Sequence, residues 1–203
     1  MHRCWILLLS LLVVTMVAAC GCTSPSTPEQ PGPVVPAREA TVPPVQGTSP
    51  PGSLTLNVGD LSSGSQLPDI NTCKGASESP AVSWDGIPEG TKSLVLILDD
   101  PDAPSGTFTH WILYNIPPEK GSLAPAQTNA KVLANGAQQG DTSAGFRGYY
   151  PVCPPIGTTH RYVFRLYAVD MDITQPTANR ESIDWALEGH TIAKTELITT
   201  FTR

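Results

Sequence analysis

Six short stretches rich in apolar residues, separated by clusters of Pro, Gly, Asn and Asp, most constrain how this chain can fold. In residues 53–58 and 161–169 apolar and polar residues alternate, which is typical of a strand with one buried face. Residues 93–98 are almost continuously apolar, which indicates a central strand covered on both faces. The other three stretches are residues 81–84, 110–116 and 196–201. Breaks at such short intervals predict a mainly β fold, an antiparallel sandwich or barrel.

One short helix is expected near the end of the chain. Ser182 can cap a segment that runs through Leu187 and that Gly189 would stop. Residues 193–201 could form a helix end or a last strand, and their β-branched residues favour the strand. The tryptophans expected in the core are Trp84, Trp111 and Trp185.

Residues 1–19 have the pattern of a signal peptide, with a basic start and an apolar run too short to span a bilayer with ease. The small residues 17–19 directly precede Cys20, an arrangement that resembles a lipobox. Cleavage there would let Cys20 carry a diacylglyceryl group, and two acyl chains suffice for stable anchoring. We therefore expect an extracytoplasmic, membrane-anchored lipoprotein. The alternatives are an ordinary signal peptide cut near Ala19, which would leave a soluble protein, or modification at Cys22, a weaker candidate.

The chain then changes composition. Residues 20–52 are rich in Pro, Ser and Thr, and such a stretch cannot bury enough apolar surface to offset its ordering entropy. We expect a lipid-anchored linker here, followed by one domain over residues 53–203. That domain carries 10 basic and 16 acidic residues, a balance that argues against nucleic acid as a partner.

The expected domain contains two cysteines, Cys73 and Cys153. An extracytoplasmic location would allow them to form a disulfide. The alternative is two separate buried thiols, which sequence alone does not exclude.

Two stiff turns, each followed by a histidine, carry the residues that could do chemistry. In the first, three carboxylates in residues 99–102 follow the central strand and precede His110. In the second, Cys153-Pro154-Pro155 precedes His160. Buried carboxylates are costly unless they are compensated, and proline fixes each turn. The two turns could build one small preorganised pocket.

These motifs resemble those of the phosphatidylethanolamine-binding protein family, and most closely its bacterial and archaeal Raf-kinase-inhibitor-like branch. The resemblance is carried by Asp100-Pro101-Asp102-Ala103-Pro104 with His110-Trp111, by Cys153-Pro154-Pro155-x-Gly-x-x-His160-Arg161-Tyr162, and by residues 189–197. It covers nearly all of residues 53–203. It implies an antiparallel β-sandwich with a few short peripheral helices and a small pocket for phosphate-like or carboxylate anions.

The resemblance also assigns residues to that pocket. The ligand-binding set that it implies is Asp100, His110, Pro154, Pro155, His160 and Tyr162. Asp100 would hold a histidine as the imidazolium or fix its tautomer, whereas Asp102 would tie down its own turn. The resemblance further suggests a cis bond between Ala103 and Pro104. His190 is expected to cap or pack and is left out of the site.

One segment departs from the family pattern. The family usually has glycines just before the Cys-Pro-Pro motif, where this chain reads Gly148-Tyr149-Tyr150-Pro151-Val152. A backbone donor to the anion could be lost, the rim could be narrowed by an aromatic lid, or the loop could vary without consequence.

Three functions compete at this point. We favour a non-catalytic binding module that could act as an inhibitor. Its expected partners are a phosphoryl or carboxylate small ligand, the membrane through its anchor, and a protein. A hydrolase that uses the Asp/His constellation would need a nucleophile, and no recognised elbow is visible. Two histidines and one carboxylate could also bind iron or zinc, but their spacing has no ligand signature. We therefore expect no catalytic residue, metal or cofactor.

Overall fold

The computed structural model describes residues 53–174 and 178–203. The expected signal peptide, Cys20 and the linker all lie outside the described residues. Within the described part, no helix is long and apolar enough to cross a membrane.

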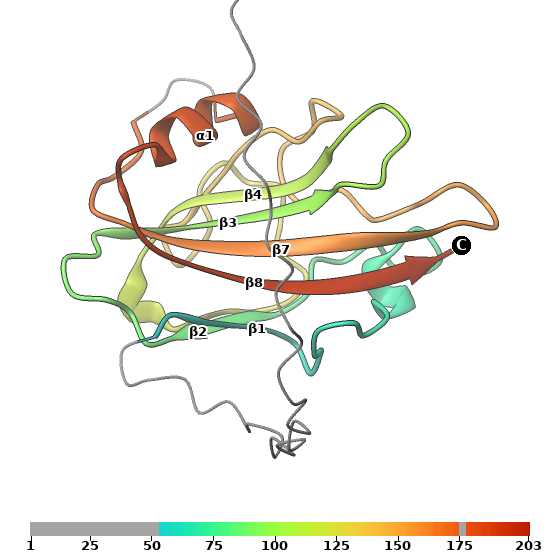
Figure 1. The fold of residues 1–203 in the computed structure, drawn as a ribbon, viewed down its shortest axis with the longest axis horizontal. Helices are drawn as coiled ribbons and strands as arrows, with labels where there is room; N and C mark the ends of the chain where they lie inside the picture. Colours follow the sequence, from blue (N-terminus) through green and yellow to red (C-terminus); the bar gives the residue numbers. More distant parts are fainter. Residues whose placement is uncertain (1–52, 175–177) are drawn as a thin grey trace, which may run out of the picture. The chain divides into compact units, whose positions relative to one another are not determined.

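Two antiparallel sheets form the expected sandwich (Figure 1). The three-stranded sheet has the order β1 (Thr55–Val58), β2 (Val82–Asp85) and β5 (Ser122–Leu123). The five-stranded sheet has the order β6 (Gln138–Gln139), β4 (Phe108–Ile116), β3 (Ser93–Asp100), β7 (Thr159–Val169) and β8 (Thr191–Thr202). The helical elements are η1 (Asp69–Asn71), η2 (Pro118–Lys120) and α1 (Arg180–Leu187). The mainly β fold is confirmed, and residues 191–202 form a strand as favoured.

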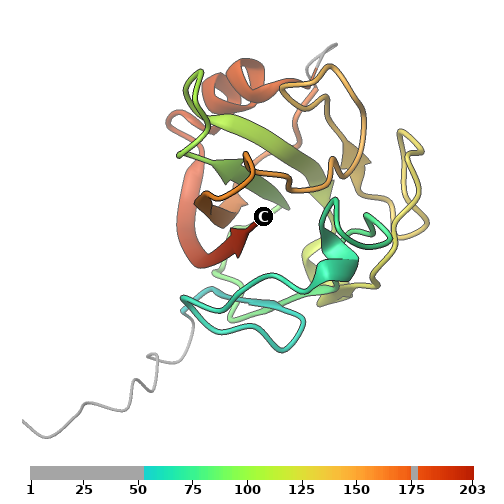
Figure 2. The ribbon, with the colours of Figure 1, turned by 90° about the vertical axis from the view of Figure 1, so that its right-hand side faces the viewer.

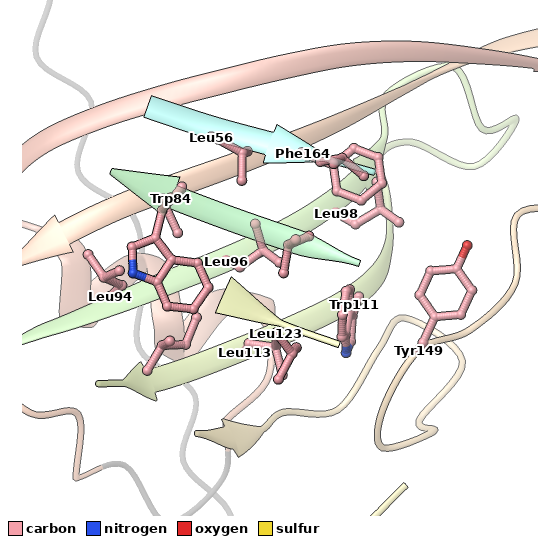
Figure 3. Packing of buried hydrophobic residues seen from close by; sticks show 14 of the residues in the cluster. Leu56, Trp84, Leu94, Leu96, Leu98, Trp111, Leu113, Leu123, Tyr149 and Phe164 are labelled. Carbon is pink, nitrogen blue, oxygen red and sulfur yellow. The ribbon is translucent and has the colours of Figure 1, made fainter. Parts of the chain in front are cut away.

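The five-stranded sheet is covered on both faces, which explains the apolar run in β3. Leu94, Leu96 and Leu98 pack into the core between the two sheets (Figure 3). Val95 and Ile97 point the other way and pack against α1, which lies over the outer face of this sheet (Figure 1). Because successive residues of a strand face opposite sides, a strand between two apolar layers must be apolar throughout.

The helix differs from its sequence-based prediction in two respects. It begins after Asn179, whose side chain accepts a hydrogen bond from the Ser182 backbone, and Ser182 returns the bond in a capping box. Trp84 and Trp111 are buried as expected, but Trp185 is 69% exposed, so its assignment to the core was wrong. The buried residues of the helix are Ile183, Ala186 and Leu187, and Trp185 lies away from the face they form.

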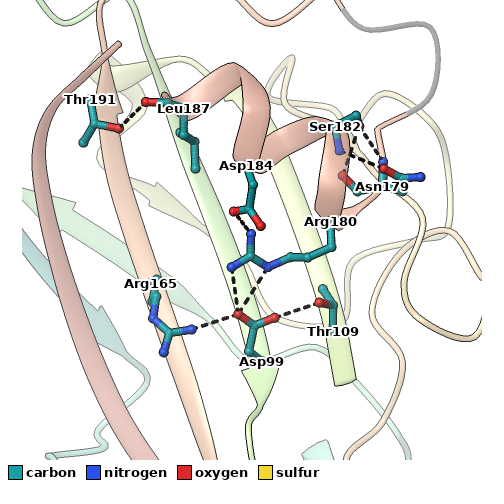
Figure 4. Close-up of polar contacts among 9 residues, drawn as sticks. All are labelled: Asp99, Thr109, Arg165, Asn179, Arg180, Ser182, Asp184, Leu187 and Thr191. Carbon is teal, nitrogen blue, oxygen red and sulfur yellow. Dashed lines mark hydrogen bonds and ion pairs between the residues drawn. The ribbon is translucent and has the colours of Figure 1, made fainter. Parts of the chain in front are cut away.

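A buried carboxylate connects α1 to the sheet. Asp99, at the end of β3, is 1% exposed and accepts hydrogen bonds from Arg165 Nη1 at 2.8 Å and from Thr109 Oγ1 at 2.7 Å (Figure 4). Arg180, the first residue of α1, reaches the same carboxylate at 3.3 Å and also pairs with Asp184. Such a buried charge is tolerated only because cations and a hydroxyl surround it.

This arrangement predicts a large difference between two similar substitutions. Asp99→Asn should lower the free energy of unfolding by about 3 kcal/mol, because it leaves two arginines without their buried partner. Asp184→Asn removes the exposed partner of Arg180 and should cost only about 0.5 kcal/mol. Urea denaturation of the two variants measures both values, and equal losses would contradict the role assigned to Asp99.

Candidate functional site

A cavity of about 500 Å³ opens at the end of the five-stranded sheet where β3 ends and β7 begins, the end that Figure 2 faces. The aspartate, histidine and arginine residues in its lining are Asp100, His110, His160 and Arg203. Most of the remaining wall is apolar, built from Pro104, Phe108, Tyr150, Pro151, Pro154 and Pro155. The two proline turns singled out in the sequence therefore meet at one cavity.

The register of the strands explains why Asp100 and His160 face this cavity. Asp100 continues the face of Leu96 and Leu98 in β3, and His160 continues the face of Tyr162 and Phe164 in β7. Both faces belong to the core between the sheets, so simple alternation brings the two residues to the same side.

His110 reaches the cavity by a different route. The pairing of β3 with β4 joins Leu98 to Trp111 and then Asp99 to Thr109, so His110 is an extra residue, a β-bulge. Strict alternation in β4 would place His110 with Ile112, which faces α1. The bulge turns the ring towards the cavity instead.

Asp100 and His160 form a buried pair. Their side chains are less than 10% exposed, and His160 Nδ1 lies 2.8 Å from Asp100 Oδ2. An ionised carboxylate only accepts hydrogen bonds, so Nδ1 carries the proton and Nε2 is the ring nitrogen left for other contacts. The other carboxylate oxygen accepts the backbone N–H of Asp102 at 2.9 Å. Asp100 therefore fixes both the ring and the turn.

His110 is held by a backbone carbonyl. Its Nδ1 donates to the Tyr150 carbonyl oxygen at 3.0 Å, which again leaves Nε2 for other contacts. Burial lowers the pKa of His110 below 6.5, although the Tyr150 carbonyl and the charges of Asp100 and Asp99 oppose this shift. Burial therefore favours the uncharged form of this ring.

Asp102 has another role than the one expected. Its carboxylate binds Arg161 through both oxygens, at 2.6 Å from Nη2 and 2.9 Å from Nε, and it also accepts the Arg161 backbone N–H. These bonds lower the pKa of Asp102 to about 2. Asp102 thus joins its turn to β7, while Asp100 supplies the bond within the turn. The suggested cis bond before Pro104 is also wrong, because the described residues contain no cis peptide bond.

Tyr162 is close to the site but does not line the cavity. Its ring is fully buried and packs edge-on against His110, with 5.5 Å between ring centroids. Its hydroxyl forms no well-aligned hydrogen bond within the described part of the chain. Burial, and then the nearby charge of Asp100, raise the pKa of Tyr162. Tyr162 therefore packs against His110 and helps to hold its ring in place.

The segment that departs from the family pattern divides between core and cavity. Tyr149 is buried, donates its hydroxyl to the Asn71 carbonyl and packs edge-on against Trp111. Tyr150 and Pro151 line the cavity. The Tyr150 N–H donates to the His110 carbonyl, and Pro151 has no N–H. Neither residue therefore leaves a backbone N–H for a ligand, and this part of the rim contributes side chains instead.

Cys73 and Cys153 form the expected disulfide. Cys153 lies in the cavity wall directly before Pro154, and the Cys73 N–H also donates to the Val152 carbonyl. The bond therefore attaches the proline wall to the loop that follows η1.

Three cavity residues, Phe108, Ala144 and Arg203, were missed from the sequence. Phe108 precedes His110 by two residues and packs against its ring, at 4.7 Å between centroids. Arg203 is brought to the cavity by β8, where Thr202 pairs with Thr159 and the Arg203 carbonyl accepts the Gly157 N–H. The register of β7 with β8 was the only signal that could have revealed Arg203, and it is not readable from one sequence.

Other polar clusters do not extend the site. His190 is half-exposed and pairs with Asp170 at 2.8 Å, outside the cavity lining. In residues 53–174 and 178–203, no three His, Cys, Asp or Glu side chains are grouped so that they could hold a metal ion.

Comparison with known proteins gives one family match and several similar proteins. The family described as phosphatidylethanolamine-binding protein matches residues 58–202. A UPF0098 protein of Methanothermobacter thermautotrophicus is 45% identical over 140 residues, which cover 68% of this chain and 91% of the relative. The candidate lipoprotein LppC of Mycobacterium tuberculosis is 36% identical over 180 residues, 87% of this chain and 84% of LppC.

Solved structures agree with this. The phosphatidylethanolamine-binding protein homologue CT736 of Chlamydia trachomatis superposes with a TM-score of 0.68 at 35% identity, over 75% of this chain and 99% of that one. YbcL of E. coli, described as a member of the mammalian family of these proteins, gives a TM-score of 0.68 at 28% identity, over 74% of this chain and 99% of YbcL.

The disulfide predicts a measurable loss of stability on reduction. The Cys73→Ser/Cys153→Ser double variant should unfold with a free energy about 2–4 kcal/mol lower than wild type, because the unfolded chain is no longer constrained. Wild type in reductant should lose a similar amount, while the variant should not respond. Denaturation curves of wild type that coincide with and without reductant would contradict the bond.

Proposed function

This chain belongs to the phosphatidylethanolamine-binding protein family, and we propose that its domain is a binding module without catalytic activity whose cavity captures a small anion. The ligand class is a phosphoryl or carboxylate group, carried by a lipid head group or a protein partner. The observation that carries this proposal is the convergence of Asp100, His110, His160 and Arg203 on one cavity.

The electrostatics favour an anion. Asp100 is bonded to His160 and to the Asp102 N–H, and a positive charge on the His160 ring would offset the charge of this carboxylate. Arg203 has no carboxylate partner within the described residues, and a guanidinium is suited to oxygen anions. The two histidines each use Nδ1 for a protein contact, so Nε2 can donate to an anionic oxygen when the ring is protonated.

The hydrolase alternative would need a nucleophile in the cavity. The disulfide occupies Cys153, so this residue offers no thiol nucleophile. The cavity lining contains no Ser or Thr side chain that the histidines could activate. These observations favour binding over hydrolysis.

The anchor forms the second part of the proposal. We propose that Cys20 is lipidated and that residues 20–52 tether the domain outside the cytoplasm. The similarity to LppC supports this, because a match over 87% of this chain must include part of residues 1–52. Palmitate labelling should be lost in Cys20→Ser and kept in Cys22→Ser, and labelling that survives in Cys20→Ser would contradict the assignment.

Binding of the proposed anion should depend on pH in a defined direction. Sulfate keeps its charge between pH 5 and 8, so any change in affinity over this range reports on the protein. The pKa of His110 lies below 6.5 in the free domain, and protonation adds a positive charge beside the anion. Isothermal titration should therefore show sulfate binding more tightly at pH 5 than at pH 8.

Three variants test which residues contribute. His160→Ala and Arg203→Gln should each weaken sulfate binding about tenfold, the effect of losing one charge-assisted hydrogen bond. His190→Ala, which alters a histidine outside the cavity, is the matched control and should bind like wild type. If His160→Ala and His190→Ala give the same titration as wild type, the anion does not bind in this cavity.

A further inference from the structure

We propose that Tyr150 is a specificity-determining residue, and that the cavity prefers an anion attached to a flat aromatic group over one attached to an aliphatic or cationic group. The inference rests on the proposed function, since it concerns the part of the ligand next to the anion.

The cavity is too large for an inorganic anion alone. A water molecule occupies about 30 Å³ of liquid, so a tetrahedral oxyanion of a few heavy atoms needs on the order of 100 Å³. The cavity holds about 500 Å³. Asp100, His110, His160 and Arg203 belong to the lining, and most of the other lining residues are aromatic residues and prolines. A ligand that fills the site must therefore carry an apolar group.

Two aromatic side chains, those of Phe108 and Tyr150, belong to the lining of this volume, and a third, outside the lining, packs against Tyr150. The rings of Phe108 and Tyr150 are 5.8 Å apart, and Phe146 follows at 6.1 Å from Tyr150. Phe108 also lies against His110. Offset and tilted contacts at these separations are the ones that aromatic groups prefer, so another ring can join the group.

The backbone holds Tyr150 in place. Its N–H donates to the His110 carbonyl at 2.8 Å, and its carbonyl accepts from His110 Nδ1 at 3.0 Å. The Tyr150 side chain is 38% exposed and therefore open to a ligand. Tyr150 therefore orients His110 through its backbone and places its own ring next to the His110 ring.

The charges in the cavity decide between an aromatic and a cationic group. Aromatic walls also bind ammonium groups, which is favourable when a carboxylate is near. Among the described residues, Asp100 is the only acidic residue of the lining, and its carboxylate is hydrogen-bonded to His160 and to the Asp102 N–H. Arg203 lies in the same lining and would repel a second cation. The apolar part of the lining is completed by Pro104, Pro151, Pro154 and Pro155.

Isothermal titration with two phosphate esters of equal charge tests the preference. Phenyl phosphate should bind the full chain in detergent solution at least tenfold more tightly than methyl phosphate. Tyr150→Ala keeps both backbone hydrogen bonds, so it should reduce this ratio to about threefold or less while changing methyl phosphate affinity less than twofold. Tyr150→Phe keeps the ring and should preserve the ratio.

The controls separate this inference from the proposed function. Tyr167→Ala removes a half-buried tyrosine on the helix-facing side of the sheet and should leave the ratio unchanged. If methyl phosphate binds and phenyl phosphate binds no more tightly, the aromatic preference is overturned and the proposed function stands. Phosphocholine that binds more tightly than phenyl phosphate would overturn it in favour of a cationic group. If neither phosphate ester binds and sulfate does not bind either, the proposed function itself fails.

Tyr150→Ala could fail to fold, which near-ultraviolet circular dichroism would reveal. Tyr150→Leu then takes its place, because leucine keeps the apolar volume and removes the flat ring. A phenyl-to-methyl ratio in Tyr150→Leu equal to that of wild type would overturn the role of Tyr150.

Discussion

The site depends on the buried hydrogen bond between Asp100 and His160. It joins residues 60 positions apart, at the end of β3 and the start of β7, and it fixes which nitrogen of His160 is left for a ligand. A buried carboxylate that lost this partner would be left with a single backbone donor, at a cost of several kcal/mol. Loss of the bond between Asp100 and His160 would therefore disturb the cavity, the tautomer of His160 and the turn that follows β3.

Adjacent carboxylates at the end of β3 serve opposite faces of the same sheet. Asp99 faces α1, where Arg165 and Arg180 neutralise its charge and Thr109 donates a hydrogen bond to it (Figure 4). Asp100 faces the cavity. Thr109 and His110 repeat this division in β4, with the bulge at His110 placing its ring on the cavity side. The network around Asp99 holds the ends of β3 and β4 together and so supports the spacing between Asp100 and His110. In each of the pairs Asp99–Asp100 and Thr109–His110, one residue therefore faces the helix side of the sheet and the other faces the cavity.

The sequence predicted features that depend on local periodicity and on motif resemblance. Alternation in residues 161–169 predicts a strand, and the continuous run in 93–98 indicates a strand buried on both sides, as the structure has them. It could not predict features that depend on register. The bulge at His110, the bond from Asp102 to Arg161 and the arrival of Arg203 each require knowing which residues of distant strands lie opposite one another. Trp185 was misplaced because a large apolar side chain was assumed to be buried, whereas α1 buries its other face.

The most direct test of the anion site follows the histidine rings themselves. Nitrogen-15 NMR of the imidazoles during a sulfate titration reports on each ring separately, and His190 serves as an internal control outside the cavity. The account predicts that the Nε2 resonances of His110 and His160 shift together and saturate at one sulfate concentration, while those of His190 stay in place. Shifts confined to His190, or no saturable shift at His110 and His160, would contradict it.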